Sequence, residues 1–268
     1  MTLLQIIVLS VVQGLTEFLP VSSSAHLILG GRAFGWTDQG LVFDVATHLG
    51  TLFAVLFYFR RDLLAMAASC LRPARSADDR HNRALVVTIA LASVPVLVIG
   101  FFARDLVEQY LRDVRVIAWM TIVFGLLLWL ADAWARRDRS LGELRWKQGL
   151  LIGLAQVCAL VPGVSRSGVT ITAGRALGFA PDAAARFSFL LAIPVIAAAG
   201  GYGAFKVFTG EAPIDGLQFL LALVFSAAAG WVCIAAFLAL LRRVGLLPFV
   251  LYRLALGLLL FWLVYATP

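Results

Sequence analysis

Residues 13–26 read QGLTEFLPVSSSAH and lie inside an otherwise apolar N-terminal region. A carboxylate at Glu17, a proline at Pro20, three hydroxyls at 22–24 and an imidazole at His26 stand where a membrane helix would carry leucine or valine. Polar and ionisable groups at membrane depth are energetically expensive, so they are candidates for a functional site.

A second polar stretch, residues 162–170, reads PGVSRSGVT and sets Arg166 among small and apolar residues. It supplies the cation and further hydroxyls that a carboxylate-bearing site in a membrane would need. We therefore expect the two stretches to meet near the middle of the membrane and to form one anion-binding site.

The composition indicates an integral membrane protein. The chain has 268 residues, of which 62% are hydrophobic and 14% charged, against about a quarter charged in soluble domains. The net charge of +7 is explained by basic cytoplasmic loops, and no basic run with interleaved aromatic residues favours nucleic-acid binding. The three cysteines, Cys70, Cys158 and Cys233, show no metal or redox spacing.

Several apolar runs have the length of a bilayer-spanning helix, roughly 17–25 residues. They predict six full spans, at residues 43–59, 84–103, 116–134, 187–205, 217–241 and 249–266. Basic residues are concentrated in the predicted loops 60–83, 136–147 and 242–248, which should therefore be cytoplasmic. Both termini would then lie outside the cytoplasm.

The two polar stretches predict two re-entrant helix pairs. The first turns at Pro20 and ends at a Gly30-Gly31 break; the second turns at Pro162 and closes near Gly178. Neither half of the first pair is long enough to cross a bilayer of about 30 Å. Such a broken backbone is tolerated at membrane depth only when it is buried in protein or faces a wet cavity.

The spacing of these features predicts an internal repeat. Pro20 precedes Phe43 by 23 residues, and Pro162 precedes Phe187 by 25. The expected fold is therefore an all-α polytopic membrane protein, one domain over 1–268, with repeat halves of opposite orientation at about 1–134 and 146–268. Inverted repeats with broken helices are typical of transporters, so the fold alone does not separate an enzyme from a transporter.

Arg166 is the candidate phosphate ligand. It follows Pro162-Gly163 at a turn that should open a half-helix, where unpaired amides and the positive end of the dipole favour anions. The planar guanidinium suits phosphate oxygens, and Gly163 lets the backbone approach a ligand. Further hydroxyl donors are Ser165, Ser167 and Thr170. The alternative is a structural ion pair between Arg166 and Glu17.

Glu17 needs a partner in a low-dielectric site, and either Arg166 or a divalent cation would serve. Its possible roles are metal ligand and general base. Gln13 lies four residues earlier, so the two side chains share a helix face. Gln13 could contribute to the site or make only a structural hydrogen bond.

The hydroxyls of Ser22, Ser23 and Ser24, followed by His26, are candidates for nucleophilic chemistry. A serine nucleophile needs a nearby base, and histidine transfers protons near neutral pH. Any single serine could instead be a helix cap. The residues leave open whether Ser23 or His26 attacks the substrate.

Three other polar residues in apolar surroundings are predicted to be structural or interfacial. His48 lies four residues after Asp44, a spacing that could make a metal-binding or hydrogen-bonded pair, and we expect a structural histidine. Arg175 and Arg186 flank the end of the second pair and are expected to extend to the membrane interface.

On these motifs the chain resembles the bacitracin-resistance type undecaprenyl pyrophosphate phosphatases. That family carries a Glu/Gln-x-x-x-Glu motif running into Phe-Leu-Pro-Val-Ser-Ser, and a Pro-Gly-x-Ser-Arg-Ser-x-x-Thr motif. They stand here at 13–23 and 162–170, and the order and hydrophobic pattern match over essentially the whole chain.

The resemblance implies a bacterial inner-membrane enzyme, with a tendency to dimerise, that removes one phosphate from undecaprenyl diphosphate with a divalent cation, Mg²⁺ or Ca²⁺. It implies that Glu17, Ser23, His26 and Arg166 are essential. Gln13 is the less acidic choice at the first motif position, so this motif offers no cage of two carboxylates. That predicts either a weaker metal dependence or ligation completed by the diphosphate.

The predicted function is therefore an undecaprenyl-diphosphate phosphatase that recycles the carrier lipid of peptidoglycan synthesis and confers bacitracin resistance. Glu17, Ser23, His26 and Arg166 would be catalytic, and Glu17 would be the metal ligand. The predicted substrate-binding residues are Gln13, Ser22, Ser24, Gly163, Ser165, Ser167 and Thr170. The alternative is a carrier that moves polyprenyl phosphate or another anionic lipid across the bilayer.

Overall fold

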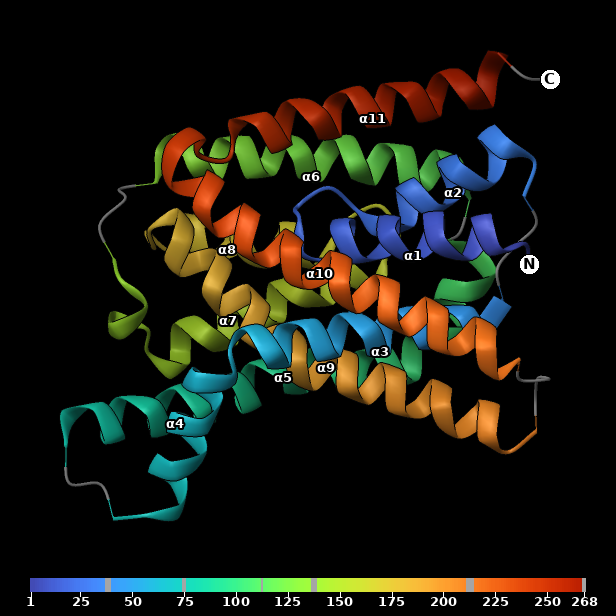
Figure 1. Cartoon of the computed structure of the whole chain (residues 1–268). Helices are drawn as coiled ribbons and strands as arrows, with labels where there is room; N and C mark the ends of the chain where they lie inside the picture. Colours follow the sequence, from blue (N-terminus) through green and yellow to red (C-terminus); the bar gives the residue numbers. More distant parts are fainter. Residues whose placement is uncertain (37–39, 74–75, 112, 136–138, 211–214, 267–268) are drawn as a thin grey trace.

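The computed structural model describes residues 1–36, 40–73, 76–111, 113–135, 139–210 and 215–266. Within these residues the chain forms eleven α-helices and two short 3₁₀ helices (Figure 1). The helices are α1 (Leu3–Phe18), α2 (Ser23–Phe34), α3 (Gly40–Tyr58), α4 (Arg60–Leu71), α5 (Ala77–Tyr110), α6 (Val114–Trp134), η1 (Leu141–Glu143), α7 (Trp146–Gln156), η2 (Val157–Leu160), α8 (Arg166–Ala176), α9 (Pro181–Phe208), α10 (Gly216–Val244) and α11 (Leu247–Ala266).

Six helices are long and apolar enough to cross a membrane, and they confirm the six predicted spans. They are α3, α5, α6, α9, α10 and α11, whose membrane-crossing segments have 19 to 29 residues. About 20 apolar residues suffice for the hydrocarbon core of a bilayer. The chain is therefore a multi-pass membrane protein.

The segment predicted as the loop 60–83 is largely helical, so that prediction is wrong. It contains α4, which packs on α5, and the first turns of α5. The hydroxyl of Ser76 accepts from the Asp79 amide at 3.0 Å, and the Asp79 carboxylate accepts from the Ser76 amide at 3.0 Å. This capping box starts α5 several residues before its apolar part begins.

The break predicted at Gly30-Gly31 is also wrong, because α2 continues through both residues. The helix ends at Gly35, whose φ of 63° is a left-handed C-cap. An added Cβ at Gly30 would lie 3.6 Å from a methyl group of Leu9. The two glycines are therefore helical residues, and Gly30 lies close to α1.

Both predicted turns interrupt the helices where the prolines indicate. α1 ends at Phe18 because Leu19 precedes Pro20 and is extended. We call residues 19–22 the first break and residues 161–165 the second break. Each break ends on a serine at the N-cap position of the next helix with positive φ, 72° at Ser22 and 69° at Ser165. The Ser165 hydroxyl accepts from the Gly168 amide, whereas Ser22 makes no side-chain cap bond.

Small residues allow the helices around the breaks to approach closely, as is common between membrane helices. α10 packs against both α1 and α3, and a Cβ added at Gly14 would lie 2.5 Å from the Ser226 carbonyl oxygen. α7 packs on α5 through a similar close contact at a glycine, because a Cβ added at Gly153 would collide with the backbone of Ala92. This packing fixes α1 and α7, and with them the position of each break.

Candidate active site

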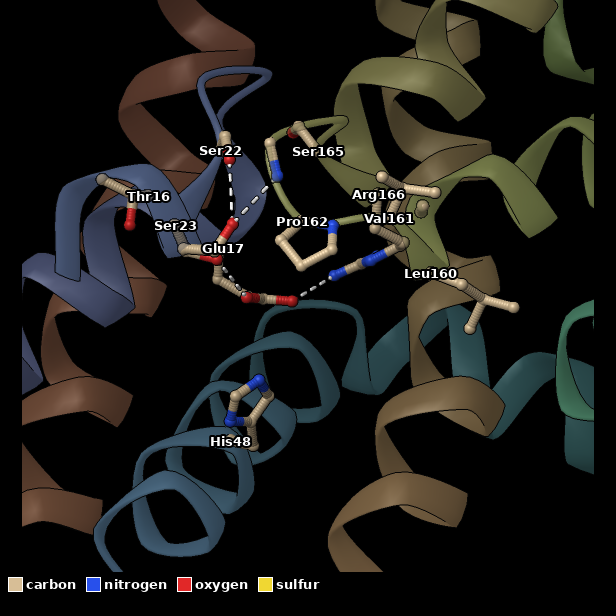
Figure 2. A pocket seen from close by; sticks show the side chains of 13 residues that line it. Thr16, Glu17, Ser22, Ser23, His48, Leu160, Val161, Pro162, Ser165 and Arg166 are labelled. Atoms are coloured by element: carbon tan, nitrogen blue, oxygen red, sulfur yellow. Dashed lines mark hydrogen bonds and ion pairs between the residues drawn. The ribbon is translucent and has the colours of Figure 1, made fainter. Parts of the chain in front are cut away.

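The two breaks face each other across a cavity of about 250 Å³ (Figure 2). Its wall comes from the end of α1, the start of α2, α3, the second break and the start of α8. The lining residues are Thr16, Glu17, Ser22, Ser23, Ser24, His48, Ala159, Leu160, Val161, Pro162, Gly163, Ser165 and Arg166. The structure therefore brings both sequence motifs into one polar site.

Glu17 and Arg166 form an ion pair across this cavity. Arg166 Nη2 lies 2.9 Å from Glu17 Oε1, and the side chains are 12% and 9% exposed. The other carboxylate oxygen, Oε2, accepts from Gln13 Nε2 at 2.9 Å and from Ser23 Oγ at 3.3 Å. The predicted shared face of Gln13 and Glu17 is confirmed, and Glu17 connects the candidate nucleophile to the candidate phosphate ligand.

Each break is also hydrogen-bonded to the first turn of the helix that follows the other break. The amide of Gly163 donates to Ser24 Oγ at 3.2 Å, and Ser167 Oγ donates to the Leu19 carbonyl at 2.8 Å. A side chain of each motif thus bonds the backbone of the other. Ser23 and Arg166 are held on neighbouring walls of the same cavity as a result.

The first residues of two helices lie at the cavity, because Ser23 begins α2 and Arg166 begins α8. The first amides of a helix have no partner within the helix and carry the positive end of its dipole, so the site favours anions. Positive φ in a residue other than glycine costs of order 1–3 kcal/mol. The chain accepts this cost at Ser22 and Ser165, and both lie at the start of a helix that opens on the cavity.

His26 and His48 lie differently from what the sequence suggested. The ring of His26 bonds the Ser22 carbonyl through Nδ1 at 2.7 Å and the Tyr252 hydroxyl through Nε2 at 2.6 Å, so both nitrogens are occupied away from Ser23. His26 does not line the cavity, whereas His48 does. His48 was predicted to be only structural; Figure 2 shows its imidazole directed toward Glu17.

The tautomer of neutral His48 follows from its hydrogen bond. Nδ1 lies 2.7 Å from the Asp44 carbonyl oxygen. A carbonyl can only accept, so Nδ1 carries the hydrogen and Nε2 is left as the acceptor. His48 therefore presents a group that can take up a proton.

The remaining predicted ligands divide into lining and supporting residues. Ser22, Ser24, Gly163 and Ser165 line the cavity. Thr170 is buried behind it and bonds the Arg166 carbonyl at 2.9 Å and Ser188 Oγ at 2.7 Å. Gln13 and Ser167 are also buried, bonded to Glu17 and to the first break.

Three further arginines lie outside the cavity lining. Arg175 was predicted to reach the membrane interface, and this is wrong: its side chain is fully buried, and Nε lies 2.8 Å from Asp132 Oδ1. Arg253 of α11 was not among the predicted site residues, yet its side chain is fully buried and donates to backbone carbonyls of both breaks. Arg186 pairs with Asp62 at 3.3 Å and is partly exposed.

The cavity offers few protein ligands for the divalent cation that the family resemblance implies. Among the described residues, no group of three or more His, Cys, Asp or Glu side chains could hold a metal ion. Of the described residues that line the cavity, Glu17 is the only one with a carboxylate and His48 the only one with an imidazole. Mg²⁺ is often held by one or two carboxylates together with substrate phosphates. The site fits a cation that takes most of its oxygen ligands from a diphosphate.

Comparison with known proteins gives one consistent result. The model of a family described as "Bacitracin resistance protein BacA" matches residues 6–259. The chain is 52% identical over 264 residues to "Undecaprenyl-diphosphatase 2" of Stutzerimonas stutzeri, covering 96% of each. It is 51% identical to "Undecaprenyl-diphosphatase" of Alcanivorax borkumensis, covering 97% of this chain and 98% of the relative. It is 47% identical to "Undecaprenyl-diphosphatase 1" of Pseudoalteromonas translucida, over 96% and 97%.

Proposed function

This chain belongs to the bacitracin resistance protein BacA family, and on that premise we propose that it is an undecaprenyl-diphosphate phosphatase of the bacterial plasma membrane. It would convert the lipid diphosphate to undecaprenyl phosphate and inorganic phosphate. The observation that carries this proposal is the cavity in which Glu17 joins Ser23 to Arg166 at the starts of two helices. Recycling of a carrier lipid for peptidoglycan synthesis would explain bacitracin resistance.

In this proposal the diphosphate enters the cavity while the polyprenyl tail lies between membrane spans. Arg166 has five N–H donors. Among its described contacts, Nη1 bonds the Ser188 carbonyl and Nη2 bonds Glu17, so other donors can bond phosphate oxygens. The first amides of α2 and α8 and the hydroxyls of Ser24 and Ser165 would share the negative charge. Such fixed donors stabilise charge that develops during phosphoryl transfer.

We propose that Ser23 is the nucleophile and Glu17 its base, since Ser23 Oγ already donates to Glu17 Oε2. The Oγ proton passes to Glu17 while Oγ bonds the terminal phosphorus. The bridging P–O bond breaks, its electron pair leaves with undecaprenyl phosphate, and Glu17 returns the proton to this product. Water then attacks the phosphorus of the phosphoserine and the Oγ–P bond breaks. The water oxygen and one of its protons leave on inorganic phosphate, and the other proton, which His48 Nε2 can accept and pass on, restores the Ser23 hydroxyl. His26, bonded to the Ser22 carbonyl, would hold the first break in place.

A divalent cation is part of the proposal. Glu17 would hold it together with the diphosphate, and it would supply charge neutralisation of the phosphate oxygens. The homodimer implied by the family resemblance stays a prediction.

The test of the function is phosphate release from undecaprenyl diphosphate by purified protein in detergent, with Mg²⁺, with Ca²⁺ or with a chelator, beside Arg166→Ala. We expect release that requires Arg166 and is reduced by the chelator. Phosphate release that persists in Arg166→Ala would refute the proposal that this cavity is the catalytic site. Its absence from the folded wild-type protein under all conditions would refute the phosphatase.

We also propose that α1–α2 and α7–α8 are re-entrant pairs in an inverted repeat. The contacts of one half have counterparts in the other: α1 packs on α10 and α7 on α5, while α8 packs on α6 and α2 on α11. The matching positive-φ residues Ser22 and Ser165 support the same correspondence. The basic segment at Arg242-Arg243 and α4 lie at the end of the bundle opposite the N-terminus (Figure 1), which supports two non-cytoplasmic termini.

This repeat also favours the second candidate function, a carrier of polyprenyl phosphate or another anionic lipid. A carrier needs anion donors but no nucleophile. Ser23→Ala should abolish phosphate release if Ser23 attacks, with folding unchanged. A carrier would keep both lipid binding and flux across liposomes in this variant.

His48→Gln should lower kcat by about 10²-fold, the lower end of what general acid–base catalysis contributes. Among the described side chains that line the cavity, His48 is the one imidazole, and imidazoles serve as general acids and bases in catalysis. Glutamine keeps a donor for the Asp44 carbonyl but cannot carry a proton. The measurement is kcat for phosphate release, with His81→Gln at the start of α5 as the control. Equal kcat for His48→Gln and wild type would exclude a role in proton transfer.

A further inference from the structure

Arg253 is a permanent cation in the interior of an apolar membrane helix. It is the seventh residue of α11 (Leu247–Ala266), and its side chain is fully buried. An isolated charge at such a place is costly unless its donors are bonded. None of the ion pairs between described residues includes Arg253, so its compensation must come from elsewhere.

The compensation comes from five backbone carbonyls. Nε donates to Thr121 at 3.0 Å; Nη1 donates to Pro20 at 3.3 Å and Val164 at 3.0 Å; Nη2 donates to Met120 at 3.4 Å and Gly163 at 3.0 Å. A guanidinium has five N–H groups. Every donor of Arg253 therefore has a partner, and every partner is a backbone oxygen.

These carbonyls belong to three separate parts of the fold. Pro20 is in the first break, Gly163 and Val164 are in the second, and the other two are in α6. Ser23 follows Pro20 by three residues, and Arg166 follows Val164 by two. One side chain thus bonds the backbone just before the candidate nucleophile and just before the candidate phosphate ligand.

Neighbouring glycines make room for the guanidinium. A Cβ added at Gly168 would lie 2.6 Å from Arg253 Nη1, and one at Gly125 would lie 3.2 Å from Arg253 Cβ. Contacts under 3.0 Å cannot be accommodated without a shift. Glycine at position 168 of α8 and at position 125 of α6 therefore leaves the space that the Arg253 side chain occupies.

We propose that Arg253 is a positioning residue for phosphoryl transfer, which holds the first and second breaks in register so that Ser23 faces a phosphate bound at Arg166. The role rests on the proposed phosphatase function. Arg253 does not line the cavity, so it acts through the breaks and not on the substrate. A lysine keeps the charge but has three donors on one nitrogen, and it cannot bond five carbonyls spread over three segments.

The test is Arg253→Lys, measured as kcat and KM for phosphate release from undecaprenyl diphosphate by protein that elutes as a folded species in detergent. We expect kcat to fall by about 10²-fold, since a displacement near 1 Å between reacting groups can cost that much. KM should change by less than about threefold, because Arg166 and the amides of α8 remain. Gly125→Ala keeps the arginine but would bring a methyl group 3.2 Å from Arg253 Cβ, and its three nearest atoms would all belong to Arg253, so it should lower kcat in the same way.

Arg175→Lys is the matched control, since Arg175 is equally buried but pairs with Asp132 outside the cavity. It should lower thermal stability and leave kcat per folded molecule unchanged. The proposal is overturned if Arg253→Lys and Gly125→Ala keep wild-type kcat, or if Arg175→Lys loses kcat to the same extent. If Arg253→Lys does not fold, the kcat of Gly125→Ala decides between the two outcomes. Absence of release from wild type, with Arg253 intact, would refute the phosphatase function itself and this role with it.

Discussion

Arg166→Lys is expected to lower kcat for phosphate release by about 10³-fold while the protein stays folded. An arginine on a transferring phosphoryl group contributes on the order of 10³–10⁵ in rate. Lysine keeps one positive charge but loses the planar fork that can bond Glu17 and phosphate oxygens together. The loss should therefore appear in kcat even at saturating lipid.

The matched control for Arg166→Lys is Arg186→Lys. Arg186 is also a paired arginine near the start of a helix, but it bonds Asp62 and lies outside the cavity. Its replacement should leave kcat within about twofold, because partly exposed ion pairs contribute little. Near-wild-type turnover of Arg166→Lys would show that the guanidinium does not stabilise the transition state.

Glu17→Gln should lower kcat by about 10³-fold and also lower thermal stability. The carboxylate accepts hydrogen bonds from Gln13, Ser23 and Arg166 at once. An amide cannot take the Ser23 proton, and removing one partner of a largely buried pair leaves the other charge uncompensated. Both kcat and the unfolding temperature in detergent should be measured on the same preparation.

Glu143→Gln serves as the control for that variant, because Glu143 accepts from Ser140 in the exposed turn of η1. It removes a carboxylate far from the cavity and should change neither quantity appreciably. If Glu17→Gln lost stability but kept kcat, Glu17 would be a structural partner of Arg166 and not a base.

The sequence was sufficient for the spans and for the meeting of the two polar stretches in one site, for definite physical reasons. Helix length and hydrophobicity must match the bilayer, so apolar runs predict spans directly. A carboxylate such as Glu17 in low dielectric needs a cation, and the second motif offered Arg166. Pro20 and Pro162 located the breaks because each stands beside a cluster of polar residues, whereas Pro95 and Pro194 stand in apolar sequence and lie inside the continuous helices α5 and α9.

Side-chain direction could not be predicted in the same way. His48 lies on a span, and the side of α3 that meets the cavity is set by packing against α10 and α9, which periodicity does not reveal. Arg253 did carry a signal, an arginine inside an apolar span, but its partners in the breaks are 89 to 233 residues away along the chain. Arg175 was mistaken for an interfacial residue because its partner, Asp132, lies 43 residues away along the chain, outside any local pattern.

The ion pair between Glu17 and Arg166 also governs which ligands can stay in the cavity. Glu17 is a competing anion that belongs to the protein, so it is always present at high effective concentration beside Arg166. Because Arg166 has donors that Glu17 does not use, an incoming phosphate would share the guanidinium with Glu17. A diphosphate has enough oxygens to reach Arg166 and both helix starts while Glu17 keeps its place, whereas a single inorganic phosphate has fewer. The pair should therefore favour exchange of the released phosphate for a new lipid diphosphate.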